Sequence, residues 1–379
     1  MSSDPTSSPR PRVAIAGGGV AALETAYALQ ALGAGRLEVI VIAPGDELVM
    51  RPMAVGAPFN AGHVERFPLG EMVAQAGARR IDGALSSVDA STRTVITADG
   101  EQIPYDALVV AVGASPHPAY PHAITFDDRQ ADALLHGLVQ DIEGGYVASL
   151  AVIVPAPPPW PLPAYELALM ASERAWDAQV PLKVTVFTPE SAPLAVFGER
   201  VSRDVGQLLS ERHVDVVTLA RCEVVQAHEI LVGGEGRRVH VERIIALPAL
   251  RGPQIPGLPA TAGGFVPVDD RGRVRGAEAV WAAGDATDYP IRHGGVAAQL
   301  ADTVAAGVLA ALTGAAEPCA FAPTLEAVLL TGGHARGVEP RRGLERLLTR
   351  TPAQAKVSAR YLGAELERRR AENPAVSYG

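Results

Sequence analysis

A glycine triplet between an apolar strand and an apolar helix constrains this chain more than any other segment. Residues Val13 to Ala16 predict a short buried strand, Gly17 to Gly19 a tight turn, and Val20 to Leu32 a buried helix. A second strand is predicted at Leu37 to Ile42. This strand, turn, helix and strand, spanning about thirty residues, form the unit from which doubly wound parallel sheets are built.

The triplet has the spacing of a dinucleotide-binding turn, G-x-G-x-x-A, made by Gly17, Gly19 and Ala22. The first glycine permits the tight turn, the second lets backbone N–H groups approach a pyrophosphate, and the small third residue lets helix and strand pack closely. The helix N-terminus then faces the phosphates. A plain flexible turn is the alternative interpretation.

One position departs from this pattern. The second strand usually ends in Glu or Asp for the adenosine ribose, whereas Ala43-Pro44 stands here. Asp46 or Glu47 could reach the ribose, or each could be a solvated loop charge.

A second strand–helix–strand unit divides the chain. It runs from a strand at Leu150 to Val154, through a helix at about Ala164 to Ser172, to a strand at Leu182 to Phe187. A length of 379 residues favours two or more domains. We therefore predict an α/β fold with these parts: a disordered leader over 1–12, a first nucleotide domain over 13–118 and 262–316, a second over 119–261, and a C-terminal extension over 317–379.

Charge and composition exclude several functions. The net charge is −9 and the cations are nearly all arginine, with lysine only at Lys183 and Lys356, which argues against nucleic-acid binding. No uninterrupted apolar run approaches the roughly 18 residues of a membrane span. Cys222 and Cys319 lie far apart without metal-type spacing, so we expect packing thiols, no metal and a cytoplasmic setting. Peripheral membrane contact and a homodimer stay open.

The C-terminal extension ends in a predicted helix over Ala353 to Ala371. Its basic run, Arg368 to Arg370, lacks the apolar stripe of a membrane-surface anchor. We therefore interpret the run as a solvated helix end.

Two further segments resemble a known superfamily. Tyr105 to Ala114 reads YDALVVAVGA, and Val280 to Thr287 reads VWAAGDAT. Together they resemble motifs of the two-dinucleotide-binding-domain flavoproteins, and most closely of sulfide:quinone oxidoreductases, flavocytochrome sulfide dehydrogenases and single-subunit NADH:quinone dehydrogenases. The resemblance implies two Rossmann-like domains, an FAD domain interrupted by an NAD-like domain, and FAD as cofactor.

The resemblance also implies site residues. Asp285 would accept hydrogen bonds from the ribityl chain, Gly113 would let backbone approach the cofactor, and the helix opening after His293 would point its positive end at the flavin ring. Arg51 would lie near the pyrophosphate and ring, or be an ordinary loop arginine. The predicted cofactor contacts are Gly17, Gly18, Gly19, Ala22, Arg51, Ala84, Gly113, Gly284, Asp285, Gly295 and Val296.

The second unit departs from the superfamily. A nicotinamide-binding member would carry G-x-G-x-x-G where this chain has the proline-rich run from Pro155 to Pro163. Proline has no N–H to donate, so NAD(P)H binding at the usual place is doubtful. The redox cysteines of sulfide dehydrogenases are absent as well, and Trp160 takes the place of one of them.

Three residues are candidates for catalysis: Trp160, Glu166 and His293. Trp160, together with Tyr165, could line a substrate or quinone pocket or simply pack. Glu166 could relay protons or contact a hydride donor, as matched glutamates do in the NADH-dependent proteins that the chain resembles, or it could be a first-turn glutamate favoured by the helix dipole. His293 could protonate or polarise the reduced flavin, because an imidazole titrates near neutral pH.

The sequence therefore predicts an FAD-dependent oxidoreductase that passes electrons from a small donor to a quinone or another acceptor. One alternative is an NAD(P)H:acceptor oxidoreductase with an altered nucleotide site, in which Glu190 contacts the ribose. The other is a flavoprotein without turnover that binds a partner.

Overall fold

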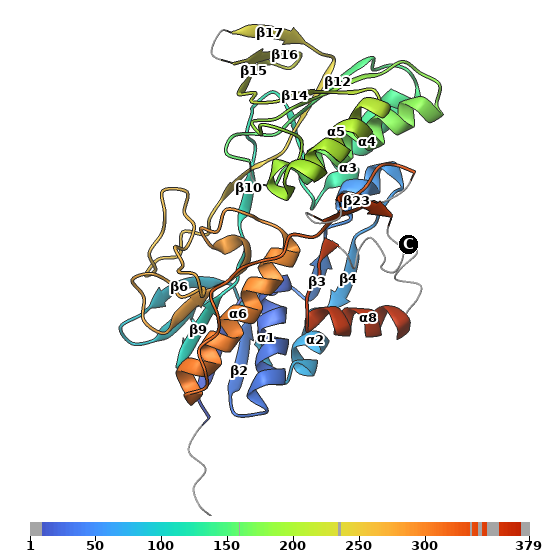
Figure 1. The fold of residues 1–379 in the computed structure, drawn as a ribbon. Coiled ribbons are helices and arrows are strands. Elements are labelled where there is room, and N and C mark those ends of the chain that lie inside the picture. The colour runs from blue at the N-terminus through green and yellow to red at the C-terminus, as the bar shows by residue number, and fades with distance from the viewer. Residues whose placement is uncertain are drawn as a thin grey trace, which may run out of the picture.

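The fold contains two five-stranded sheets, and within each sheet all strands are parallel. One sheet lies above the other in the view of Figure 1. The computed structural model describes residues 10–158, 160–233, 236–333, 336–339, 343–346 and 356–372. Residues 1–9 of the predicted leader lie outside this part. The first sheet runs in the order β20 (Val280–Ala282), β9 (Ala107–Val110), β1 (Arg12–Ala16), β2 (Glu38–Ile42) and β5 (Arg79–Ile81).

The first sheet is covered on both faces, which explains its continuous apolar strands. Val13 and Ile15 of β1 pack with the helices α1 (Val20–Gly33) and α6 (Gly294–Thr313), whereas Ala14 packs on the opposite face. That face is covered by a small antiparallel sheet made of β6 (Leu85–Asp89), β7 (Thr94–Thr97) and β8 (Gln102–Pro104).

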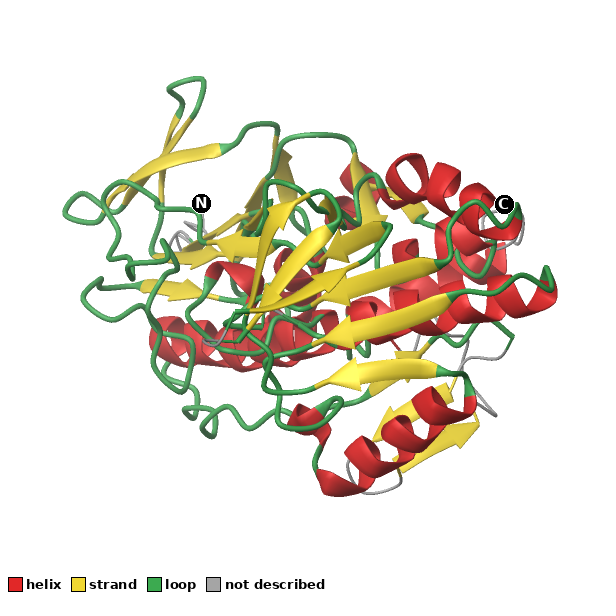
Figure 2. Ribbon diagram, turned by 90° about the horizontal axis from the view of Figure 1, so that it is seen from above, coloured by secondary structure: helices red, strands yellow, loops and turns green. Residues whose placement is uncertain are grey.

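The second sheet has the same parallel design. Figure 2 shows parallel strands side by side with helices packed against them. The covering helices are α3 (Ala131–Glu143), α4 (Leu162–Asp177) and α5 (Glu199–Glu211). The strand order is β11 (Ile124–Thr125), β18 (Arg243–Ala246), β12 (Ser149–Ile153), β13 (Lys183–Phe187) and β14 (Val214–Val217). The predicted α/β fold with two doubly wound units is confirmed.

The chain crosses between the sheets at a two-stranded ribbon. β10 (Ser115–His117) leaves the first sheet and pairs antiparallel with β19 (Ala249–Arg251), which returns from the second. A hairpin sheet of β15 (Cys222–Gln226), β16 (Glu229–Val232) and β17 (Arg237–His240) stands at the far end of the second unit (Figure 1).

The C-terminal extension packs on both units. β21 (Ala327–Leu329) lies in the core of the second unit and pairs with β22 (Arg336–Glu339), which pairs with β23 (Gly343–Arg346). The helix α8 (Leu362–Glu372) instead packs Leu362 and Leu366 into the core of the first unit. This extension is therefore part of both hydrophobic cores.

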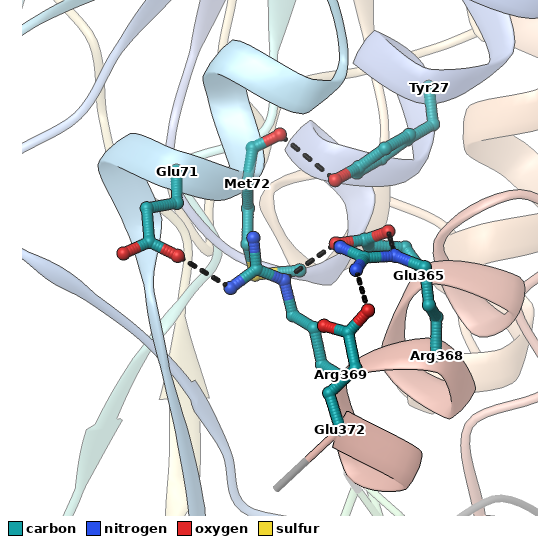
Figure 3. A network of polar contacts seen from close by, with 7 residues as sticks. All are labelled: Tyr27, Glu71, Met72, Glu365, Arg368, Arg369 and Glu372. Atoms are coloured by element: carbon teal, nitrogen blue, oxygen red, sulfur yellow. Dashed lines mark hydrogen bonds and ion pairs between the residues drawn. The ribbon is translucent and has the colours of Figure 1, made fainter.

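The predicted solvated end of α8 is wrong for two of its three arginines. Arg369 donates to Glu71 at 3.0 Å and to Glu365 at 2.6 Å, as Figure 3 shows. Arg370 forms a two-pronged pair with Glu65 at 2.7 and 2.6 Å. Both side chains are only 12% exposed. The acidic partners Glu65 and Glu71 lie in β4 (Glu65–Pro68) and α2 (Leu69–Gln75), about 300 residues earlier in the chain. The sequence around the arginines therefore could not predict these ion pairs.

Among the described residues, α6 alone is long and apolar enough to span a membrane. Of its most apolar stretch, 61% is buried inside the fold, where it packs along α1. In this structure α6 is a core helix.

Candidate functional site

A cavity of about 530 Å³ lies where the first sheet meets the second unit. The loops after β1, β9 and β20 open into it because the carboxyl ends of parallel strands meet at one edge of a sheet. The helix α4, the start of α6 and the C-terminal extension close the other side. Predicted residues that line the cavity are Gly18, Gly19, Arg51, Gly113, Trp160, Glu166, Gly284, Asp285 and His293.

Gly17 and Gly19 differ in the space around them. Gly17 has φ +129°, and a Cβ there would lie 2.2 Å from the carbonyl oxygen of Ala111. Gly19 precedes α1, and a Cβ there would meet no atom within 4 Å. The first glycine is thus required by the fold, and the second leaves the N-terminus of α1 open to the cavity. This cradle fits the pyrophosphate of a dinucleotide.

Asp285 places a carboxylate in the cavity beside a fixed positive charge. Burial raises the pKa of Asp285, and Arg292 opposes that shift. The Arg292 guanidinium donates to the carbonyl oxygens of Tyr289 and Thr287 at 3.0 and 3.2 Å and lies 3.8 Å above the ring of Phe265. A carboxylate at this point suits a hydroxyl-rich ligand, such as the ribityl chain of FAD.

Asp285→Ala is expected to weaken FAD binding by about 10- to 100-fold, which is the loss of one hydrogen bond to a charged group. Titration of the apoprotein with FAD, followed by flavin fluorescence, measures it. Asp215→Ala is the control, because the Asp215 side chain is 64% exposed, pairs with Lys183 and does not line the cavity. Equal affinities of the two variants would remove Asp285 from the cofactor site.

Arg51 lines the cavity near Asp128. Burial raises the pKa of Asp128, and the positive charge of Arg51 opposes the rise. This arginine therefore faces the cavity with a carboxylate beside it.

Five predicted contacts do not line the cavity: Gly17, whose place in the turn is described above, and Ala22, Ala84, Gly295 and Val296. Ala22, Gly295 and Val296 are buried behind its wall, where they pack the helices α1 and α6. Ala84 lies elsewhere: its carbonyl oxygen accepts a hydrogen bond of 2.8 Å from the N–H of Ala98. Ala84 therefore lies beside the small antiparallel sheet and does not line the cavity.

Glu166 forms a buried ion pair that the sequence did not predict. The Nζ of Lys356 donates to Oε1 of Glu166 at 2.6 Å, and the N–H of Leu330 donates to the same oxygen at 3.0 Å. Oε2 of Glu166 is buried and has no hydrogen-bond partner among the residues that the structure describes. Glu166 and Lys356 both line the cavity.

Burial sets the protonation of this group. It raises the pKa of Glu166, and the Lys356 ammonium opposes that rise. Burial also lowers the pKa of His293 to about 4, and the positive charge of Lys356 lowers it further. His293 is therefore neutral at pH 7, and the expected titration near neutral pH is not what this environment favours.

Trp160 stands between the cavity and the second unit. Its ring centroid lies 4.7 Å from that of His293 and 5.7 Å from that of Phe197. Tyr165, by contrast, is fully buried outside the lining of the cavity. Of the two aromatic candidates, only Trp160 forms a wall of the site.

Glu190 is engaged within the protein. Its carboxylate accepts hydrogen bonds from the Tyr165 hydroxyl at 2.7 Å, the Thr188 hydroxyl at 3.0 Å and the N–H of Ala195 at 3.1 Å. Both oxygens thus have partners, which leaves little of this side chain for a ribose.

Lys356 lines the cavity and pairs with Glu166, but it is not among the site residues that the sequence predicts. Its isolation as one of two lysines in an arginine-rich chain was the available signal. Neither cysteine thiol contributes to the cavity: Cys222 and Cys319 are both outside its lining. Burial also raises the pKa of Cys222 to about 12. Within the described ranges no group of three His, Cys, Asp or Glu side chains could hold a metal ion.

The chain matches the family model of pyridine nucleotide-disulphide oxidoreductases over residues 3–131 and 163–306. An NADH dehydrogenase-like protein of Mycobacterium tuberculosis is 30% identical over 158 residues, which are 38% of this chain and 38% of that protein. The match thus spans little more than a third of this relative.

Solved structures share the fold at low identity. The sulfide:quinone oxidoreductase of the hyperthermophilic bacterium Aquifex aeolicus has a TM-score of 0.76 at 20% identity, covering 96% of this chain and 91% of that one. NDH2 of Plasmodium falciparum, in complex with NADH, has a TM-score of 0.57 at 14% identity, covering 74% and 65%.

The family match covers more than half of the chain, so the chain belongs to the pyridine nucleotide-disulphide oxidoreductase family. This membership agrees with the predicted class, a flavin-dependent oxidoreductase with FAD as its cofactor.

Proposed function

We propose that this protein passes two electrons through FAD from a small donor to a quinone or another small acceptor, with Glu166 and Lys356 handling the accompanying proton. The observation that carries the proposal is Oε2 of Glu166, a buried oxygen without a partner in the described structure, on a residue that lines the cavity. A buried acceptor of this kind is costly unless a ligand completes it.

The residues divide the work as follows. FAD, when bound, supplies the two-electron chemistry. Glu166 can hold a proton at Oε2 while Oε1 stays fixed by Lys356 and Leu330. A carboxyl group whose pKa is raised by burial is suited to give and take a proton near neutral pH. Neutral His293 and Trp160 form the wall beside it and exclude water.

NAD(P)H is a weaker candidate for the donor. The loop that would cradle its phosphates contains the proline-rich run, and α4 begins at Leu162 after Pro161 instead of a glycine turn. Glu190, the candidate ribose contact, is hydrogen-bonded to Tyr165, Thr188 and Ala195. The similarity to an NADH dehydrogenase-like protein keeps this alternative worth testing.

The predicted domain limits are part of the proposal: an FAD domain over 13–118 and 262–316, an NAD-like domain over 119–261, and an extension over 317–379. The ribbon of β10 and β19 agrees with two crossings between them. We propose a cytoplasmic protein in which the extension completes the site.

The test is anaerobic absorbance spectroscopy of the purified flavoprotein. With excess NADH or NADPH we expect no bleaching of the flavin within seconds, and after photoreduction we expect a soluble quinone to restore the oxidised spectrum. Glu166→Gln is expected to slow that reoxidation by about 100-fold or more, the size of a general acid–base contribution.

Glu173→Gln is the matched control, since Glu173 lies on the same helix and pairs with Arg212 instead of facing the cavity. Prompt bleaching by NADH would establish the nicotinamide alternative. An unchanged rate in Glu166→Gln would remove the buried pair from proton transfer.

A further inference from the structure

The segment from Lys356 to Leu362, here called the strap, links the cavity to α8. Val357 lies against the first turn of α6, so closely that a Cβ on Gly294 would come within 2.9 Å of it. Ser358 lies next to Gly295 in the same way, at 3.2 Å. The strap thus rests on the helix start that borders the cavity and carries Lys356 into the site.

Glu24 of α1 holds the other end of the strap. One carboxylate oxygen accepts the N–H of Tyr361 at 2.9 Å, and the other accepts the N–H of Leu362 at 2.6 Å. Glu24 is fully buried. The first N–H groups of a helix lack partners within that helix, so the Glu24 carboxylate, which belongs to α1, caps the N-terminus of α8. A carboxylate is also favourable there because the N-terminus is the positive end of the α8 dipole.

Asp302 of α6 lies beside Glu24. Its Oδ1 is buried and unpartnered within the described part of the chain. The charged groups around Asp302 are Glu24 of α1, Arg360 of the strap, and Glu367 and Arg370 of α8. Asp302, Arg360, Glu367 and Arg370 together line a neighbouring cavity of about 370 Å³.

Two carboxyl groups in one buried place cannot both be ionised at low cost. Burial, the larger effect, and the neighbouring Glu24 together raise the pKa of Asp302 to about 8, while the positive charge of Arg360 opposes the rise. At neutral pH Asp302 is therefore protonated and can donate a hydrogen bond to Glu24, while the Glu24 oxygens accept the two N–H groups of the strap.

We propose that Glu24 is a positioning residue, which clamps the strap so that the Lys356 ammonium stays on Glu166, and that protonated Asp302 supports the clamp. This inference rests on the proposed function, in which Lys356 and Glu166 form the proton-handling pair. Glu24 itself touches neither the cavity nor a reacting atom.

The clamp gives the strap a pH dependence. The strap residues Val357 to Arg360 line the neighbouring cavity together with Asp302, so docking adds to the burial that raises the pKa of Asp302, and the docked strap binds a proton more tightly than the released one. Docking is therefore strongest at low pH and weakens as the pH rises through about 8. Above that pH, repulsion between Asp302 and Glu24 favours release.

Amine labelling tests the inference, because the chain has two lysines with opposite exposure. The Lys183 side chain is 71% exposed and that of Lys356 is 5% exposed. The purified flavoprotein is treated briefly with an acetylating reagent between pH 6 and 9, and mass spectrometry gives the labelling of Lys356 relative to Lys183. In the unaltered protein we expect protection at pH 6 to 7 and a rising ratio toward pH 9.

The variants have opposite expected results. Glu24→Gln presents an N–H group to one of the strap N–H donors, and the Lys356 ratio is expected to rise about tenfold or more even at pH 6, the effect of losing one charge-assisted hydrogen bond. Asp302→Asn keeps a neutral donor toward Glu24, so its ratio should stay low and flat across the whole pH range. Glu372→Gln, at the exposed end of α8, is the control and should behave like the unaltered protein.

Protection of Lys356 in Glu24→Gln equal to that of the unaltered protein would overturn the positioning role. A pH-dependent rise in Asp302→Asn equal to that of the unaltered protein would overturn the role of the buried acid. Should Glu24→Gln fail to fold, the comparison of Asp302→Asn with the unaltered protein still tests the clamp, because Asp302 is proposed to act on the strap only through Glu24. Labelling needs no donor or acceptor, so a failure of the proposed redox function would not be mistaken for a failure of the clamp.

Discussion

Lys356→Met is expected to lower the free energy of unfolding by about 3–5 kcal/mol at pH 8, because removing one partner of a buried ion pair leaves the other charge uncompensated. The charge left behind is that of Glu166, whose side chain is 1% exposed. Urea unfolding followed by tryptophan fluorescence measures the loss.

The loss should depend on pH in a defined direction. Burial raises the folded-state pKa of Glu166, so its protonated form is tolerated, and the stability of the variant should be highest at low pH and fall as the pH rises through that raised value. The double variant Glu166→Gln with Lys356→Met carries no unpaired charge and should recover most of the stability at pH 8. A single variant as stable at pH 8 as the unaltered protein would contradict a buried pair.

Gly17→Ala is expected to destabilise the protein by about 2–6 kcal/mol. This range combines the strain of a positive φ with the overlap of the new methyl group with backbone. The overlapping atom, the carbonyl oxygen of Ala111, belongs to the neighbouring strand region and cannot move aside as a flexible side chain would. Thermal unfolding of the apoprotein measures the change.

Gly19→Ala separates the fold from the cofactor. Its new methyl group meets no protein atom within 4 Å, so the apoprotein should unfold at nearly the same temperature as the unaltered one. The methyl group nevertheless projects beside the N-terminus of α1, and FAD affinity should fall. If Gly17→Ala proved as stable as Gly19→Ala, the tight approach at residue 17 would be wrong.

The residues proposed to contact the cofactor could be predicted from the sequence, because each belongs to a short motif of neighbouring residues. The turn at Gly17 to Gly19 lies between a strand and a helix, and Asp285 comes three residues after the end of an apolar strand. A few neighbouring residues therefore predict both the fold and the place of each group. The strand boundaries differ only slightly: β1 begins at Arg12, where the sequence predicts Val13.

The opposite wall could not be predicted in this way. Glu166 and Lys356 are 190 residues apart, and no periodicity relates them. The same holds for the arginines of α8, whose acidic partners lie on distant elements. The bond from Tyr165 to Glu190 depends on how tightly a helix packs on a strand, and the neutral state of His293 depends on burial, which a single sequence does not show.

The double docking of the C-terminal extension also sets an order of events during synthesis. A ribosome completes every strand of both parallel sheets before it reaches Lys356. The glycine cradle and Asp285 can therefore assemble on a nascent chain, and FAD can bind, while Glu166 still lacks its cation. The redox site would then mature in two stages, with cofactor capture first and proton handling only after the last helix has docked.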